Sequence, residues 1–176
     1  MAKVGIFFGT DTGNTRKFAK KMAQQLGEAI ADKPVNINKA SVEDLLAYDV
    51  LILGSPTYGD GELPGASSGV QESWEEFLPQ LAGADFSGKT IALYGLGDQA
   101  GYADNFVDAI GILYDTFSCC NAKFIGFTSC EGYEFNRSKA QIDDQFVGLV
   151  LDEDCQKELS EQRLNAWLSE ISAAWQ

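Results

Sequence analysis

Short apolar runs that end in glycine alternate with helix-patterned stretches along the chain, and this alternation constrains the fold more than any other feature. The runs at 4–8, 50–53 and 91–94 are each followed by glycine, which is typical of strands buried on both faces of a sheet. Apolar residues with the spacing of one helix face recur at 18–26, 74–81, 106–117 and 164–175. The repeated strand–helix order predicts a parallel sheet covered by helices on both faces, a three-layer α/β/α sandwich.

Weaker signals fill the gaps between these elements. Val35 and Ile37 predict a short strand after Pro34. Ser41 and Asp44 have the spacing of a capping box, so they predict the start of a short helix. The order along the chain is therefore strand and helix in five successive pairs.

The last strand of the sheet is interrupted in the sequence. A strand is predicted at 123–127, and an apolar run follows only at 146–151, after a mostly polar stretch without helical spacing. We interpret 128–145 as an insertion in the fifth strand, because it is too short to form a domain of its own. We expect residues 1–176 to form a single domain.

The charge of the chain excludes several classes of partner. The net charge is −13, from 26 acidic and 13 basic residues, so nucleic acid and anionic lipid surfaces are disfavoured as partners. Residues 58–115 hold ten acidic residues and a single base, Lys89. This density predicts a docking face for a basic protein, and a solvated acidic surface is the alternative.

Histidine and cysteine usage limits the chemistry. The chain has no histidine, which excludes His-dependent triads and His-ligated metal sites. The four cysteines form no C-x-x-C pair, so we expect free thiols and no metal site. No apolar run approaches the length of a membrane span, and the first residues lack the features of a signal peptide. We therefore expect a cytoplasmic protein without membrane insertion, and a monomer.

The loop after the first strand is rich in hydroxyl groups. It reads Gly-Thr-Asp-Thr-Gly-Asn-Thr over 9–15 and leads into a helix, so side chains and backbone N–H groups converge on a helix N-terminus. It lacks the Gly-Lys-Ser/Thr ending of a triphosphate loop, which predicts a monoester phosphate held without Lys or Mg²⁺. Simple helix capping, the alternative, would need a single such side chain. The candidate phosphate ligands are Thr10, Asp11, Thr12, Gly13, Asn14 and Thr15.

Two further loops carry a tyrosine after a strand. Tyr58 and Tyr102 stand among turn residues, and together they predict a slot for a flat ring, although a single loop tyrosine is more often a packing residue. Gly59 can adopt positive φ, so the peptide after Tyr58 could reorient. A formal dinucleotide fingerprint at 95–100 is disfavoured because Asp98 would lie where the pyrophosphate must sit. The candidate residues in these loops are Ser55, Pro56, Thr57, Tyr58, Gly59, Leu96, Gly97, Asp98, Gln99 and Tyr102.

With these motifs the chain resembles the flavodoxins, specifically the long-chain group. The motifs are Thr-Asp-Thr-Gly-Asn-Thr at 10–15, Pro-Thr-Tyr-Gly at 56–59, Gly-Asp-Gln-x-Gly-Tyr at 97–102 and Phe-Val-Gly-Leu-x-Leu-Asp-Glu-Asp at 146–154. The resemblance covers essentially the whole chain. It implies a flavodoxin-like fold, with a five-stranded parallel sheet in the order 2-1-3-4-5 and the insertion that is typical of long-chain members.

The resemblance also implies the cofactor and its contacts. Noncovalent FMN would bind through its phosphate at 10–15, and Tyr58 and Tyr102 would flank the isoalloxazine ring. The backbone over 96–99 would meet the pyrimidine edge of the ring, and Asp154 would lie near the ribityl chain.

The function implied by the resemblance is electron transfer at low potential, one electron at a time, without catalytic residues or substrate turnover. Implied partners are basic redox proteins such as flavodoxin/ferredoxin–NADP reductase, nitrogenase reductase, pyruvate oxidoreductase or photosystem I. An FMN-dependent NAD(P)H:quinone reductase on the same fold is the alternative. A signalling receiver domain is excluded because Ser55 and Phe127 occupy the places of its Asp and Lys.

Overall fold

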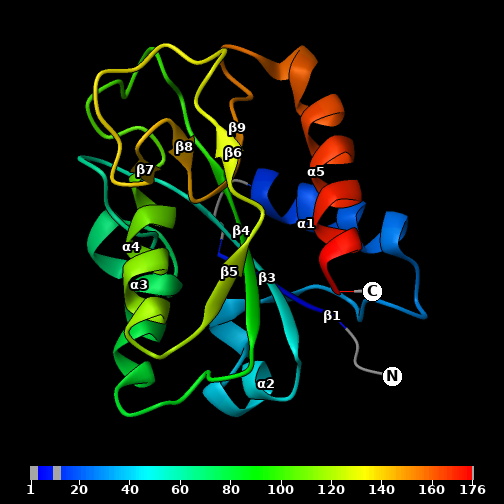
Figure 1. The fold of residues 1–176 in the computed structure, drawn as a ribbon. Helices are drawn as coiled ribbons and strands as arrows, with labels where there is room; N and C mark the ends of the chain where they lie inside the picture. Colours follow the sequence, from blue (N-terminus) through cyan, green and yellow to red (C-terminus); the bar gives the residue numbers. More distant parts are fainter. Residues whose placement is uncertain (1–3, 10–12, 176) are drawn as a thin grey trace.

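A parallel sheet forms the centre of the molecule in the computed structural model, which describes residues 4–9 and 13–175 (Figure 1). Its strands lie in the order β2-β1-β3-β4-β5, which confirms the predicted order 2-1-3-4-5. All neighbouring pairs in this sheet run parallel. The strands are β1 (Val4–Phe8), β2 (Val35–Asn36), β3 (Val50–Pro56), β4 (Thr90–Leu96) and β5 (Lys123–Ile125).

The fifth strand is split into two halves that share one neighbour. β5 pairs with β4 as far as Ala92, and β9 (Gly148–Leu151) pairs with β4 from Leu93 onward. The segment between the halves folds into a small antiparallel sheet in the order β6-β8-β7 (Figure 1). Its strands are β6 (Thr128–Ser129), β7 (Gln141–Ile142) and β8 (Gln145–Phe146). The predicted insertion in the last strand is confirmed.

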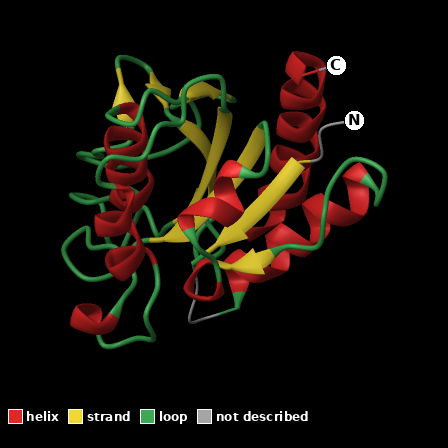
Figure 2. Cartoon of the chain, turned by 90° about the horizontal axis from the view of Figure 1, so that it is seen from below, coloured by secondary structure: helices red, strands yellow, loops and turns green. Residues whose placement is uncertain are grey.

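Helices cover both faces of the sheet, as the views from the front and from below show (Figures 1 and 2). One face carries α1 (Asn14–Leu26) and α5 (Ser160–Trp175), and the other carries α2 (Val42–Leu46), α3 (Trp74–Phe77) and α4 (Asp108–Ser118). Short 3₁₀ helices lie at Ile37–Lys39, Ala66–Ser68, Leu78–Leu81 and Lys157–Leu159. No helix among residues 4–9 and 13–175 is long and apolar enough to cross a membrane.

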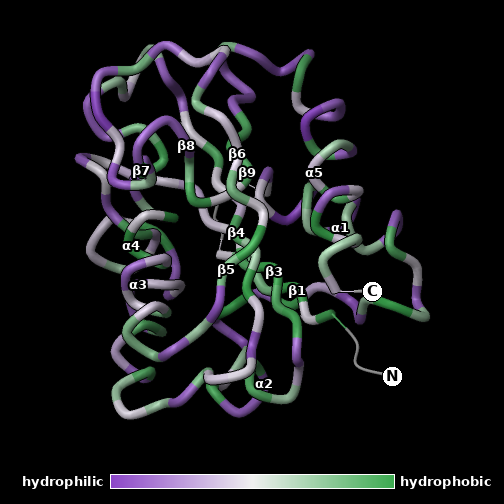
Figure 3. The backbone as a smooth tube through the Cα atoms, viewed as in Figure 1, coloured by the Kyte–Doolittle hydropathy of each residue, from purple (hydrophilic) through white to green (hydrophobic). Residues whose placement is uncertain are grey.

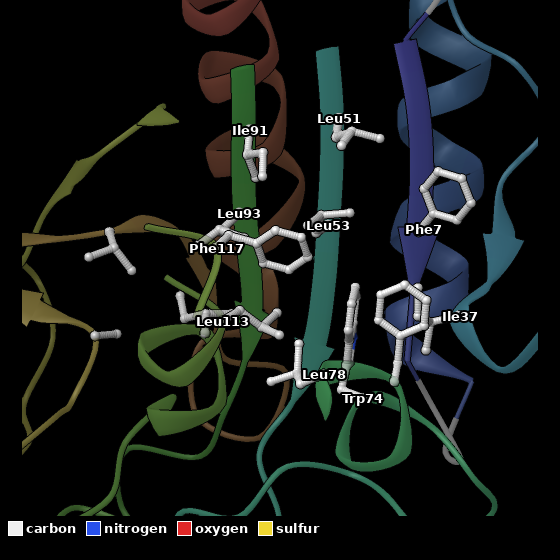
Figure 4. Packing of buried hydrophobic residues seen from close by; sticks show 14 of the residues in the cluster. Phe7, Ile37, Leu51, Leu53, Trp74, Leu78, Ile91, Leu93, Leu113 and Phe117 are labelled. Atoms are coloured by element: carbon white, nitrogen blue, oxygen red, sulfur yellow. The ribbon is translucent and has the colours of Figure 1, made fainter. Parts of the chain in front are cut away.

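Side chains of successive strand residues supply two separate cores. Phe7 faces the α2, α3 and α4 side with Leu53 and Trp74, and Phe8 faces the α1 and α5 side with Phe18. Figure 4 shows the first of these cores between the sheet and its helices. Because every residue of β1 and β3 is buried, both strands are apolar throughout most of their length, and the hydropathy colouring shows this at the centre of Figure 3.

Several helix and strand limits differ from those predicted. The expected helix at 74–81 is α3 followed by a 3₁₀ turn, since Pro79 has no N–H to continue the α-helical bonds. Phe106 is buried but precedes α4. The second strand ends at Asn36, where the chain turns into a 3₁₀ helix. The capping box of α2, by contrast, is present, with Ser41 and Asp44 exchanging hydrogen bonds.

Candidate functional site

The predicted site residues that the structure describes lie at or beside the carboxyl edge of the sheet. Phe8 lies opposite Gly54, and Pro56 lies opposite Leu96, which in turn lies opposite Leu151. The loops that follow β1, β3, β4 and β9 therefore leave the sheet at one edge. The chain passes from β1 to β2 on one side and from β3 to β4 on the other. Open α/β sheets bind ligands at such a reversal, outside the carboxyl ends of the strands.

The start of α1 carries a buried hydroxyl group that is left without a partner. Thr15 is fully buried, and its Oγ1 makes no hydrogen bond to any part of the chain that the structure describes. Asn14 beside it is half-buried and is the first residue of the helix. Thr10, Asp11 and Thr12 lie outside the described residues. An unsatisfied hydroxyl beside the N-terminus of a 13-residue helix is suited to an anion.

A tyrosine from the middle of the sheet supports this helix start. Gly54 and Tyr94 are paired between β3 and β4, and a Cβ on Gly54 would overlap the Tyr94 ring. The glycine therefore allows the ring to cross β3, and the Tyr94 hydroxyl donates to the carbonyl of Thr15 at 2.9 Å. Burial raises the pKa of Tyr94, which keeps this donor protonated. The sequence analysis assigned no role in the site to Tyr94.

The loop after β3 is closed by a backbone bridge. The Tyr58 N–H donates to the Glu62 carbonyl at 3.0 Å, and the Tyr58 carbonyl accepts from the N–H groups of Gly61 and Glu62. Gly59 has a φ of 51°, in the left-handed region that favours glycine. The Tyr58 side chain is half-buried, whereas Gly59 is exposed. The tip of this loop is therefore accessible while its base is fixed.

The base of the same loop is buried in the protein. Ser55 is fully buried and donates through Oγ to the carbonyl of Pro56, which is also buried. Thr57 is half-buried, and its Oγ1 accepts from the Ala109 N–H at 3.0 Å. Ser55, Pro56 and Thr57 were predicted as cofactor contacts, and the side chains of Ser55 and Thr57 make their hydrogen bonds within the protein.

The loop after β4 is organised by Asp98. Its Oδ1 accepts from the N–H groups of Ala100 and Gly101 at 3.1 and 2.9 Å. Hydrogen bonds hold the pKa of Asp98 below its usual value, and the bond from the Gly101 N–H has the largest effect. Partial burial of the carboxyl group acts in the opposite direction but is smaller. Tyr102 follows with 50% of its surface exposed, so its ring is accessible to a ligand.

A buried carboxylate that the sequence analysis did not single out joins this loop to the end of β9. Asp152 is fully buried. Its Oδ2 accepts from the backbone and side-chain N–H groups of Gln99, and its Oδ1 accepts from the N–H groups of Asp154 and Cys155. Gln99 is itself buried, and its Oε1 accepts from the Glu134 N–H at 2.7 Å. Asp152 therefore fixes the backbone of the predicted ring loop.

Asp154, the predicted ribityl-side residue, lies at the same turn but is exposed. Partial desolvation of its carboxyl group, together with the neighbouring charges of Asp98, Asp152 and Glu153, raises the pKa of Asp154. The run of acids at the end of β9 was a signal for this turn, but the sequence did not tell which of the acids points inward.

One group of side chains has the composition of a metal site. Ligand atoms of Asp98, Asp152 and Cys155 lie within 4.8 Å of one another, and this is the only such group in residues 4–9 and 13–175. Both oxygens of Asp152 already accept two hydrogen bonds each. The Cys155 thiol donates to Asp98 at 3.4 Å. These hydrogen bonds give the three side chains a structural role. All four cysteines are free thiols.

Comparison with known proteins gives a consistent result. A family model described as flavodoxin matches residues 6–167. A flavodoxin of Klebsiella pneumoniae is 56% identical over 172 residues, 97% of each chain. Flavodoxin 1 of Escherichia coli strain K12 is 46% identical over 173 residues, 98% of this chain and 94% of that protein. Among solved structures, Fusobacterium nucleatum flavodoxin bound to flavin mononucleotide has a TM-score of 0.89 at 31% identity, with full coverage of both chains.

Proposed function

This chain belongs to the flavodoxin family, and we propose that it is a low-potential one-electron carrier that binds FMN noncovalently at the carboxyl edge of its sheet. The observation that carries the proposal is the buried, unpartnered hydroxyl of Thr15 at the start of α1. A phosphate accepting from this hydroxyl and from the helix N-terminus would satisfy it. The FMN bound to the Fusobacterium relative supports this choice of ligand.

The chain's part in phosphate binding is proposed to rest on neutral donors. Hydroxyl and amide side chains at Thr10, Thr12, Asn14 and Thr15 would donate with the backbone N–H groups of the first helical turn. Tyr94 would hold the carbonyl of Thr15 in place and so orient that turn. Neutral donors do not compensate the negative charge of the phosphate, so the N–H groups at the helix N-terminus would stabilise that charge.

The two tyrosine loops, namely the Tyr58 loop at 57–62 and the Tyr102 loop at 97–102, are proposed to hold the ring. Tyr58 and Tyr102 would pack against its two faces, and the backbone over 96–99 would meet its pyrimidine edge. The hydrogen bonds between Asp152 and Gln99 support this arrangement, because they fix the conformation of that backbone. The flavin, when bound, supplies the redox chemistry, and the protein binds, orients and shields it.

Asp154 is proposed to contact the ribityl chain. Its position in the turn after β9, directly beside the 97–102 loop, supports this role, because Asp98 and Asp152 are its charged neighbours. Its exposed side chain would change its contacts when the cofactor binds.

Exchange of electrons is proposed to occur with basic redox proteins that dock on the loop edge. Exposed acids lie in or beside the tyrosine loops at Asp60, Glu62 and Asp104, so a basic partner would be steered toward the ring. A flavodoxin/ferredoxin–NADP reductase, a nitrogenase reductase, a pyruvate oxidoreductase and photosystem I are the proposed classes of partner. We propose that the chain acts as a monomeric single domain in the cytoplasm, without substrate turnover of its own.

The test is titration of the cofactor-free protein with FMN and, in parallel, with riboflavin. The proposal expects FMN to bind far more tightly than riboflavin, because only FMN carries the phosphate. Equal affinity would contradict the phosphate site, and no binding would contradict the cofactor. Rapid NADPH oxidation by the FMN-loaded protein alone, with a quinone as acceptor, would instead support the quinone reductase.

A further inference from the structure

Asp108 is a buried carboxyl group that none of the roles above uses. It is the first residue of α4 and has only 4% of its surface exposed. Burial raises the pKa of Asp108, against the opposing effects of the Lys139 N–H and of the Lys139 and Arg137 charges. A buried carboxyl group is costly to keep, so its contacts are informative.

Its two oxygens contact two different segments. Oδ1 accepts from the backbone N–H of Lys139, in the segment that interrupts the fifth strand, at 2.7 Å. Oδ2 lies against Gly61, where a Cβ on the glycine would overlap it. Gly61 has a φ of 92° and is buried. The carboxyl group therefore lies between the insertion and the base of the Tyr58 loop.

The first turn of α4 holds both ends of that loop. Asp108 contacts Gly61 at one end, and the N–H of the next residue, Ala109, donates to Thr57 Oγ1 at the other. Gly59 and Asp60 between them are exposed. The loop is thus anchored at both ends by two consecutive helix residues, and only its tip is free of this support.

Charged side chains of both signs surround the group. The hollow beside Asp108 is also lined by Asp60, Asp104, Arg137 and Lys139. Two of these neighbours are positive and two are negative, so Asp108 does not belong to a uniformly acidic surface. Substitutions that change shape and charge separately can show which of the two matters.

We propose that Asp108 is a positioning residue for the flavin. Its carboxyl group, which is held by the insertion through the Lys139 N–H, fixes the position of Gly61 and so places the Tyr58 loop against the ring. This role rests on the proposed FMN function. It assigns to the insertion at 128–145 a specific task in the site, carried by one backbone N–H. It also predicts that the geometry of Asp108, and not its charge, is what the site requires.

Two substitutions separate these properties. Asp108→Asn keeps the shape and an acceptor for the Lys139 N–H but removes the charge, whereas Asp108→Glu keeps the charge and adds a methylene that must displace Gly61 or the insertion. Asp108→Ala removes both contacts. Asp115→Asn, an exposed acid on the same helix, is the matched control. Urea unfolding of each cofactor-free variant establishes that it folds.

The readouts are the visible circular dichroism of the oxidised, FMN-loaded protein and the affinities for FMN and riboflavin. We expect Asp108→Glu and Asp108→Ala to alter the dichroism and to weaken the binding of FMN and riboflavin equally, by about tenfold, which is the size of one lost hydrogen bond. Asp108→Asn and Asp115→Asn should remain close to the wild type.

Wild-type dichroism and affinity in Asp108→Glu would overturn the positioning role, and so would equal effects of Asp108→Asn and Asp108→Glu. If Asp108→Ala does not fold, the contrast between the glutamate and asparagine variants still decides the matter. Failure of the wild-type protein to bind FMN would contradict the proposed function instead, and the titration of the wild-type protein detects this outcome separately.

Discussion

The carboxylate of Asp152 accepts hydrogen bonds from both the backbone N–H and the side-chain amide of Gln99, at 3.0 and 2.7 Å. Both residues are buried. Through this pair the end of β9 fixes the loop after β4, and Gln99 extends the connection to the insertion by accepting from the Glu134 N–H. These hydrogen bonds thus join three segments far apart in the sequence beside the proposed flavin site.

Asp152→Asn should lower the free energy of unfolding by about 2–4 kcal/mol, because its new NH₂ group must face two N–H donors in place of an oxygen. Denaturation by urea measures this change. The matched control is Asp154→Asn at the same turn, whose exposed side chain should leave stability within about 0.5 kcal/mol. Equal losses in the two variants would show that the buried hydrogen bonds are not the cause.

Thr15→Val should act in opposite directions on the cofactor-free and loaded proteins. Without cofactor, removal of a buried and unsatisfied hydroxyl should leave stability unchanged or raise it, by up to about 1 kcal/mol. FMN affinity should fall by about 1.5–3 kcal/mol through loss of a hydrogen bond to a charged phosphate, and riboflavin affinity should stay constant. Fluorescence titration and urea unfolding measure both effects. Equal weakening of both ligands would place the phosphate elsewhere.

Gly59→Ala should destabilise the Tyr58 loop by about 1–2 kcal/mol, since the residue has a φ of 51°. The atoms nearest to a Cβ there would be those of the Glu62 carboxyl group, at ordinary contact distance, so we expect backbone strain and no overlap. Bound flavin would take up a proton with its first electron, and we expect a carbonyl of the Tyr58 loop to accept from it after the peptide reorients. An alanine at this position resists the reorientation, so the first reduction potential should become more negative by some tens of millivolts. For one electron, a tenfold change in the equilibrium constant corresponds to about 59 mV.

The control for that variant is Gly69→Ala, whose glycine also has positive φ and open space around it but lies outside the tyrosine loop. It should cost similar stability and leave the potential unchanged. An unchanged first potential in Gly59→Ala would exclude the reorientation.

Neutralising Asp60, Glu62 and Asp104 together should raise the second reduction potential and flatten the salt dependence of electron transfer to a basic reductase. All three are exposed. Asp98 is left intact because its carboxylate caps Ala100 and Gly101. Stopped-flow rates over a range of ionic strength provide the measurement. The control triple variant at Glu28, Glu43 and Glu170 has the same net charge change away from the edge, and equal slopes in both would contradict local steering.

The positions of the strands and the split of the fifth strand were predictable because buried parallel strands leave a strong local pattern, whereas the order 2-1-3-4-5 was implied by the resemblance to the flavodoxins. The apolar run at 4–8 is β1 without change. Likewise, the polar stretch at 128–145 separates two strand halves that pair with successive residues of β4. These features depend on residues close together in the sequence, which is why composition and spacing revealed them.

The supporting residues of the site were not predictable in the same way. Asp152 and Asp154 have the same chemistry two positions apart, and only the packing of β9 against β4 decides which one is buried. Similarly, the acid-rich stretch at 58–115 includes Asp108, which is buried against Gly61, and Glu75, which accepts from Ser67. Acid density therefore overstated the free surface charge, since tertiary contacts use part of it.

A potentiometric titration of the FMN-loaded protein, followed by visible absorbance, tests the central claim most directly. The account predicts two separate one-electron steps, the second well below the potential of free FMN, because a ring packed between two tyrosines beside Asp60, Glu62 and Asp104 resists added negative charge. A single two-electron step at the potential of free FMN would contradict it.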